Sequence, residues 1–369
     1  MLRKLFILSI SLSSFLFTNA QTASAQVTAS DSVVNTDAEQ VNKPFFAITG
    51  SADVYYRYDF NKQASNNKTS FTNSHKSFEF GAARIKFEHA TGKVGMVAEL
   101  AFGKRVEEFN YNDEKTLQAV RQLYITYSPW KNIKLTAGNW ATHFNNEIFE
   151  PDANRNYSMS YMFTYGPFFH TGVKAEATFG KHGFMLGVAN PNDFKFANTG
   201  SKKYVISQYS FSPNDNIKAY LNYFSGQRQN DSAKVSQAEV LLSQKFSDKF
   251  NIGYTGCVAF NRYPQAGKYG NSQNWWGSGL YFNYDPESWV GLTLRTEYFS
   301  DKKAQNVFAT IPSGGNVFES TLSANFKVDN LIIIPEFRWE NASQEIYTKS
   351  NGAGIKTNGS FLIAVVYKF

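Results

Sequence analysis

Cysteine is almost missing from this chain, which contains Cys257 and no other. A single thiol cannot form an internal disulfide, so a small cystine-stapled domain is excluded, as is a metal site built on paired cysteines. Beyond the N-terminus no apolar run approaches eighteen residues, and the mean hydropathy of −0.39 argues against a bundle of membrane-spanning helices. The net charge of +7 comes from dispersed basic residues, so nucleic-acid binding is not indicated.

The N-terminus has the pattern of a secretory signal peptide. Two basic residues, Arg3 and Lys4, precede the apolar stretch from Leu5 to Phe17, which is too short to span a membrane as a helix. We expect a signal peptide at residues 1–20, or cleavage after Ala25 instead. The mature protein is therefore expected to leave the cytoplasm.

Aromatic residues are abundant. They make up 17% of the chain, as 34 Phe, 21 Tyr and 6 Trp, which exceeds the need of a soluble core. Transmembrane β-barrels use such residues in two girdles, one at each membrane interface. The composition therefore favours a barrel in a membrane.

Many segments alternate between apolar and polar residues, as strands with two different faces do. In residues 361–369 every second residue is apolar or aromatic, while Lys368 lies on the other face. Residues 331–340 repeat the pattern, with Glu336 and Arg338 opposite the apolar face. Charged residues recur on the non-apolar face, which indicates a polar interior.

This test predicts an all-β fold, a transmembrane antiparallel barrel of about sixteen strands. We expect the strands near residues 45–60, 78–89, 93–105, 117–128, 132–140, 168–180, 182–189, 203–211, 215–226, 233–247, 249–262, 274–284, 290–298, 318–327, 331–340 and 361–369.

The connections alternate between short and long, as expected when one membrane side carries tight turns and the other carries loops. Short turns are expected at 91–92, 129–131, 180–181, 213–214, 247–248, 285–287 and 328–329. Long polar loops are expected at 61–77, 106–116, 141–167, 190–202, 227–232, 263–273, 300–315 and 341–358. An even strand number places both ends of the barrel at the periplasmic side. Residues 21–44 would then be a flexible polar periplasmic tail, and residues 45–369 a single barrel domain.

A barrel of this size is too wide for side chains alone to fill. With no plug domain, a water-filled channel for passive diffusion of small hydrophilic solutes and ions is expected. The longest connection, 141–167, exceeds the length at which structureless loops usually have a function, and is the candidate constriction loop. Its candidate site residues are Glu147, Glu150, Asp152, Arg155 and Tyr157.

Strand parity places basic side chains on the wall of the lumen. The main candidates are Arg57, Arg84, Lys86, Lys174, Arg295 and Arg338. Acidic candidates on the same face are nearly as numerous, so the preference for anions or cations stays open. Many of these charges are expected to pair across strands.

A central segment of the chain resembles one known family. Gly138-Asn139-Trp140, Glu147, the run from Asn154 to Ser160 and the run from Pro167 to Val173 look like the signature of the OmpL-like beta-barrel porin-2 family. The resemblance implies a porin in the outer membrane of a Gram-negative bacterium. It brings no ligand residues and no cofactor.

The end of the last predicted strand, Tyr367-Lys368-Phe369, resembles the signal read by the outer-membrane barrel assembly machinery. Phe369 would serve equally as a girdle aromatic. Outer-membrane lipid, lipopolysaccharide and small solutes are the other expected partners, and assembly into a homo-oligomer is left open.

Two other functions are weighed. An external receptor or adhesin-like barrel would use the long loops to bind partners. An enzyme would need converging groups, and the only candidates are His143 and His170 near Glu147 and Ser158. A metal held by His143 and Glu147 has suitable atoms but would need a helix for that spacing. We therefore expect no enzyme, no metal and no cofactor.

Overall fold

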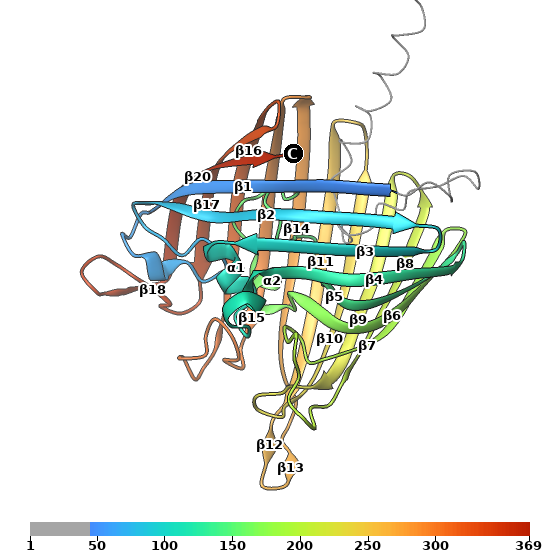
Figure 1. Ribbon diagram of the computed structural model, residues 1–369. Coiled ribbons are helices and arrows are strands. Elements are labelled where there is room, and N and C mark those ends of the chain that lie inside the picture. The colour runs from blue at the N-terminus through green and yellow to red at the C-terminus, as the bar shows by residue number, and fades with distance from the viewer. Residues whose placement is uncertain (1–44) are drawn as a thin grey trace, which may run out of the picture.

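The computed structural model describes residues 45–369, and the expected signal peptide and the tail 21–44 lie outside the described residues. Sixteen antiparallel strands form one closed barrel, in which each strand pairs with its neighbours along the chain and β1 pairs with β20 (Figure 1). The predicted fold class and strand number are confirmed. The barrel strands are β1 (Phe45–Asp59), β2 (Ser77–Thr91), β3 (Val94–Phe102), β4 (Val120–Trp130), β5 (Ile133–Ala141), β6 (Phe169–Phe179), β7 (His182–Ala189), β8 (Tyr204–Asn214), β9 (Ile217–Gln227), β10 (Lys234–Lys245), β11 (Phe250–Arg262), β14 (Gln273–Glu287), β15 (Val290–Asp301), β16 (Gly315–Val328), β17 (Leu331–Ala342) and β20 (Thr357–Lys368).

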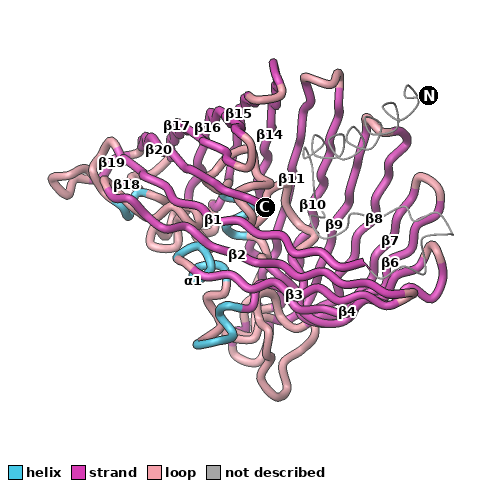
Figure 2. Tube along the Cα trace, turned by 45° about the horizontal axis from the view of Figure 1, so that its top comes forward, coloured by secondary structure: helices cyan, strands magenta, loops and turns pink. Residues whose placement is uncertain are grey.

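The short turns lie at one end of the barrel and the long connections gather at the other (Figure 2). Several long connections contain structure of their own, including two small hairpins. These elements are η1 (Ala64–Asn66), α1 (Lys104–Phe109), η2 (Lys115–Ala119), α2 (Tyr161–Tyr165), β12 (Pro264–Gln265) with β13 (Lys268–Tyr269), and β18 (Tyr347–Thr348) with β19 (Gly354–Ile355). None of the helices within residues 45–369 is long and apolar enough to cross a membrane.

Three predicted turns begin too early in the sequence. The residues predicted as turns at 129–130, 213–214 and 285–287 are the ends of β4, β8 and β14. In each case the register shifts just before the turn, and a proline lies within or beside the shift. A bulge tolerates a residue without an N–H, so proline there does not end the strand.

Two predicted strands include residues that are helical. The strand predicted at 117–128 begins only at Val120, after η2. The strand predicted at 93–105 ends at Phe102, and Lys104–Phe109 form the helix α1. Gly103 precedes the helix with a φ of 118°, a conformation that only glycine adopts readily. A Cβ at this position would lie 2.5 Å from the carbonyl oxygen of Gly81. Gly103 therefore lets the chain turn away from the strand.

The two faces of the strands divide as the sequence pattern predicts. On β17, Phe337 and Trp339 are 45% and 40% exposed, whereas Glu336 and Arg338 are 2% and 3% exposed. Exposed aromatic residues follow the two rims of the barrel, with leucine, isoleucine and valine between them. Near the turns they include Trp130, Phe179, Phe246, Trp289 and Phe369, and near the loops Phe60, Phe78, Phe102, Trp276 and Phe318. Such belts match the two interfaces of a bilayer.

Candidate functional site: the inner loop and the barrel interior

The connection between β5 and β6, residues 142–168, lies inside the barrel and is called the inner loop here. Backbone amides of the inner loop are hydrogen-bonded to glutamates that point inward from three strands, at N–O distances of 2.6 to 3.1 Å. A buried loop needs such partners for its amides, and a carboxylate is a strong acceptor. The bonds run from Asn145 to Glu239 of β10, from Tyr157 and Ser158 to Glu336 of β17, and from Tyr161 and Met162 to Glu297 of β15.

The three acidic residues predicted for the constriction each contact an arginine of the wall. These ion pairs neutralise the loop charges locally and fix the inner loop to opposite sides of the barrel. The pairs are Glu147 with Arg295 at 2.5 Å, Glu150 with Arg121 at 3.2 Å, and Asp152 with Arg84 at 2.9 Å.

Arg155 and Tyr157, the other two predicted loop residues, reach different walls. The Arg155 guanidinium lies 2.6 Å from the Asp285 carboxylate of β14. The Tyr157 side chain is fully buried, and its hydroxyl donates a hydrogen bond to Asp53 of β1. The inner loop therefore spans the interior of the barrel.

Three of the basic residues predicted for the lumen wall hold loops. Arg295 and Arg338 donate to the carbonyl oxygens of Ser158 and Met159 in the inner loop, both at 2.7 Å. Arg57 donates to the carbonyl oxygen of Ser74, in the first long connection, at 2.7 Å. All three side chains are at most 3% exposed.

The interior is not uniformly covered. Inward side chains along β14 to β20 are buried except near the turns, where Asp285 and Lys327 keep contact with solvent, and many of the buried ones contact the inner loop. Inward side chains of β2 to β9 towards the turn end remain partly exposed. The partly exposed set comprises Lys86, Glu88, Thr126, Lys134, Lys174, Glu176, Gln208, Ser210, Lys218 and Tyr220.

Lys86 and Lys174, the remaining predicted wall residues besides Arg84, belong to this partly exposed wall. Each lies near a carboxylate two residues further along its own strand. Lys86 is 2.9 Å from Glu88, and Lys174 is 3.2 Å from Glu176. They keep some contact with solvent, unlike the three buried arginines.

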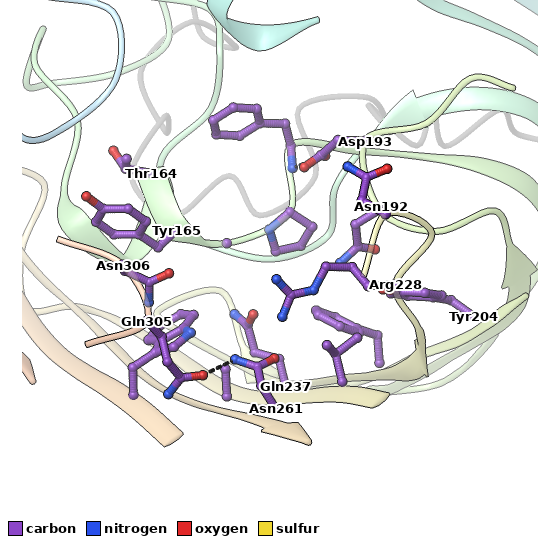
Figure 3. A pocket seen from close by; sticks show the side chains of 18 of the residues that line it. Thr164, Tyr165, Asn192, Asp193, Tyr204, Arg228, Gln237, Asn261, Gln305 and Asn306 are labelled. Atoms are coloured by element: carbon purple, nitrogen blue, oxygen red, sulfur yellow. Dashed lines mark hydrogen bonds between the residues drawn. The ribbon is translucent and has the colours of Figure 1, made fainter. Parts of the chain in front are cut away.

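A cavity of about 510 Å³ lies at the loop end of the barrel, and we call it the outer cavity (Figure 3). It is lined by the end of the inner loop from Thr164 to Phe168, by the ends of β8 to β11 and β14, and by six other long connections. The sequence pattern did not reveal it, because its lining comes from many separate segments.

Two residues that hold the inner loop in place were not predicted from the sequence. Arg105 of α1 is fully buried and donates to the carbonyl oxygens of Phe149 and Tyr157 of the inner loop, at 3.2 and 3.3 Å. Asp193 accepts hydrogen bonds from the amides of Phe168 and Phe169, at 2.7 and 3.1 Å. Burial raises the pKa of the Asp193 carboxyl to about 6. Both residues lie in connections, where alternation gives no signal.

The histidines considered for catalysis or metal binding pack together inside the barrel. The rings of His143 and His170 lie 5.2 Å apart, and His143 is 4% exposed. Burial holds the pKa of His143 well below its usual value. Among residues 45–369, no group of three or more metal-ligating side chains is assembled.

The sequence model of the OmpL-like beta-barrel porin-2 family matches residues 46–369. The chain belongs to this family. The predicted family is therefore confirmed. Membership of this family places the porin in the outer membrane of a Gram-negative bacterium, as predicted. No curated protein matches its sequence.

Solved outer-membrane proteins share the fold of this porin. An anion-selective porin from Comamonas acidovorans is 11% identical, with a TM-score of 0.58, covering 89% of this chain and all of its own. The channel DcaP of Acinetobacter baumannii is 12% identical, with a TM-score of 0.57, over 88% and 97%. OmpT of Vibrio cholerae is 12% identical, with a TM-score of 0.54, over 91% and 99%. Identities this low show the fold alone.

The family and the closed barrel together establish the function. This porin is an outer-membrane channel for the passive diffusion of small solutes. The receptor or adhesin-like alternative is not favoured. Its family and fold are those of channels rather than of enzymes.

Proposed function

We propose that the inner loop is the constriction element of this porin, and that solutes pass between it and the wall formed by β2 to β9. The observation that carries the proposal is the difference between the two halves of the interior. The inner loop packs extensively on β14 to β20 and β1, and it also reaches β2 and β4 through the Asp152–Arg84 and Glu150–Arg121 ion pairs. Towards the turn end, the polar inward side chains of β2 to β9 stay in contact with solvent. Glu147, Glu150, Asp152, Arg155 and Tyr157 hold the loop in this position.

The charges of the open wall favour anions. Lys86, Lys134, Lys174 and Lys218 lie on it towards the turns. The two partly exposed acids there, Glu88 and Glu176, contact three of these lysines, so the four lysines leave a surplus of two positive charges. The loop acids add little negative charge to the passage, because each is paired with an arginine. A ring or strip of excess positive charge raises the local concentration of anions.

Single-channel recording in a planar bilayer, under a gradient of potassium chloride, tests both statements. We expect stable conductance steps and a zero-current potential that shows preference for chloride. The double variant Lys134→Gln and Lys218→Gln should move that potential towards cation preference. The control Lys303→Gln, exposed in the loop between β15 and β16, should leave it unchanged.

A preference for potassium in the unmodified porin would overturn the proposed role of the lysine wall. A barrel that shows normal heat-modifiable migration in gel electrophoresis but carries no current would overturn the proposed open passage. That result would favour the alternative in which the long loops bind external partners. The two failures are distinct, since the second shows no current at all.

We infer that the aromatic belts contact lipid and lipopolysaccharide, and that Tyr367 and Phe369 are recognised by the barrel assembly machinery. We also infer that the protein has no catalytic activity, since buried salt bridges and backbone contacts account for the charged groups of the inner loop. Homo-oligomer formation stays a prediction, which chemical crosslinking in membranes can test.

A further inference from the structure

We propose that the outer cavity is a binding site for a short, uncharged carbohydrate that this porin takes up from outside. The inference rests on the proposed function, because the cavity is placed at the loop end of the barrel, beside the inner loop. Its volume of about 510 Å³ falls within the range of roughly 300–1,000 Å³ typical of small-molecule sites.

Unpaired amide groups gather at this cavity. Gln237 of β10 is 2% exposed, and its side-chain Nε2 has no hydrogen-bond partner among the described residues. The same holds for Nε2 of Gln305 and for Oδ1 of Asn192. Buried polar atoms are nearly always paired, so three unpaired atoms around one cavity point to a missing partner.

These atoms offer both kinds of hydrogen bond. The two glutamine nitrogens donate and the asparagine oxygen accepts. A sugar hydroxyl can donate and accept at once, which suits a mixed set better than a group of one kind does. Figure 3 shows Gln237, Asn261 and Gln305 on one side of the cavity and Asn192 on another.

Aromatic side chains supply the other part of the recognition. Tyr111 of the connection between β3 and β4, Tyr165 of the inner loop and Tyr263 of the connection between β11 and β14 line the cavity, and all three side chains keep contact with solvent. The face of an aromatic ring is electron-rich, and it attracts the partly positive C–H groups on the face of a sugar ring. Stacking on such rings adds contact area without requiring charge.

The charged residues of the cavity already have partners. Arg228 pairs with Asp231 at 3.4 Å, and Asp193 accepts amide hydrogen bonds. Glu108 accepts from the amide of Phe71 at 2.8 Å. With two acids and one base in the lining, the cavity has no surplus positive charge for an anionic ligand. The geometry therefore points to a neutral sugar.

Isothermal titration calorimetry of the refolded barrel in detergent, with the neutral trisaccharide maltotriose, tests the proposal. We expect saturable binding to the unmodified protein. Gln237→Leu keeps the side-chain size but removes the amide, and should weaken binding about tenfold, which is about 1.4 kcal/mol. Gln305→Ala, in the loop between β15 and β16, is a second variant with the same expected direction.

The matched control is Gln244→Leu, the same substitution on the outward face of the same strand. It should bind maltotriose as the unmodified protein does. Equal affinity of all three variants would overturn the assigned site. No binding of maltotriose, or binding of trigalacturonic acid in preference to it, would overturn the neutral carbohydrate.

Binding in detergent does not depend on ion flow, so the two proposals can fail separately. A barrel that binds maltotriose but shows no conductance supports the site and contradicts the open passage. A conducting barrel without maltotriose binding does the reverse.

Discussion

Arg295 is fully buried where the inner loop meets β15 and β16. Its guanidinium contacts Glu147 of the loop at 2.5 Å and Glu319 of the wall at 2.6 Å. Arg295→Met would leave Glu147 buried without a cation and Glu319 with only Arg338, 3.9 Å away, at a cost of about 3–5 kcal/mol. We expect the inner loop to detach, which single-channel recording should register as a larger conductance.

Arg262→Met is the matched control, because Arg262 is exposed at the outer end of β11. It should leave the conductance unchanged. Faster protease cleavage within residues 142–168 should accompany the Arg295 substitution. A normal conductance and cleavage rate in that variant would show that the loop does not depend on this ion pair.

We expect Asp193 to make the end of the inner loop sensitive to pH. Burial raises its pKa from 3.8 to about 6, so the folded protein holds this proton more tightly than the unfolded chain does. The stabilisation is complete below about pH 4 and is lost as the pH rises through about 6. Hydrogen exchange should therefore show greater protection of the Phe168 and Phe169 amides at about pH 4 than at about pH 7.

Asp193→Asn separates this effect from the general influence of pH on exchange. The amide oxygen can still accept from the two backbone amides, but it does not titrate in this range. Protection factors of that variant should be nearly equal at the two pH values. Equal factors in the unmodified protein would contradict the role given to Asp193.

At the scale of elements, β4 shows how the two faces of one strand differ. Ile125 points outward and is 58% exposed, whereas the neighbouring Thr126 points inward and is partly exposed. Ile125→Arg should destabilise the barrel in lipid vesicles by about 2–4 kcal/mol, because it places a charge near the middle of the membrane. Thr126→Arg should cost much less, since the lumen can hydrate the charge. Denaturant titrations followed by tryptophan fluorescence compare the two, and equal losses would contradict the assignment of faces.

The strands could be predicted because each one carries its own signal, an alternation imposed by lipid on one side and a polar interior on the other. β17 and β20 were clear for that reason, and the shifted ends of β4 and β14 were not, because a bulge leaves no mark in the alternation. The path of the inner loop could not be predicted. It depends on contacts between distant residues, such as Tyr157 with Asp53 and Tyr161 with Glu297, which have no local pattern.

The candidate site shows the same limit. Sequence parity identified Arg295 and Arg338 as inward residues, but not that both hold the inner loop. Arg121 was missed as the partner of Glu150, because it lies at the start of β4 where alternation was weak. The sequence shows that a residue is charged and points inward, but only the fold shows which residue it contacts.

At the scale of the whole molecule, the barrel is closed by the seam where β1 pairs with β20. Beyond the ladder itself, Gly50 and Phe369 exchange two backbone hydrogen bonds of 3.0 Å. The Phe369 ring occupies the space above Gly50, where a Cβ would lie 2.6 Å from it. Deleting Phe369 should reduce the amount of heat-modifiable barrel found in the outer membrane.

Phe369→Tyr keeps the ring and the backbone bonds, and should assemble normally. Refolding of the deletion variant in detergent distinguishes a weak seam from lost recognition by the assembly machinery. Normal assembly of the deletion variant in cells would count against an assembly signal at this position.

The pairing of β1 with β20 also has a consequence for the order of events during folding. Ser51 lies opposite Lys368, so the contact that closes the ring joins segments separated by most of the described chain. Closing so long a loop has a high entropic cost, which makes this step late and slow. Until it happens, both strands present unsatisfied amides and carbonyls that lipid cannot accommodate. We therefore expect the barrel with an open seam to be the folding intermediate most prone to aggregation.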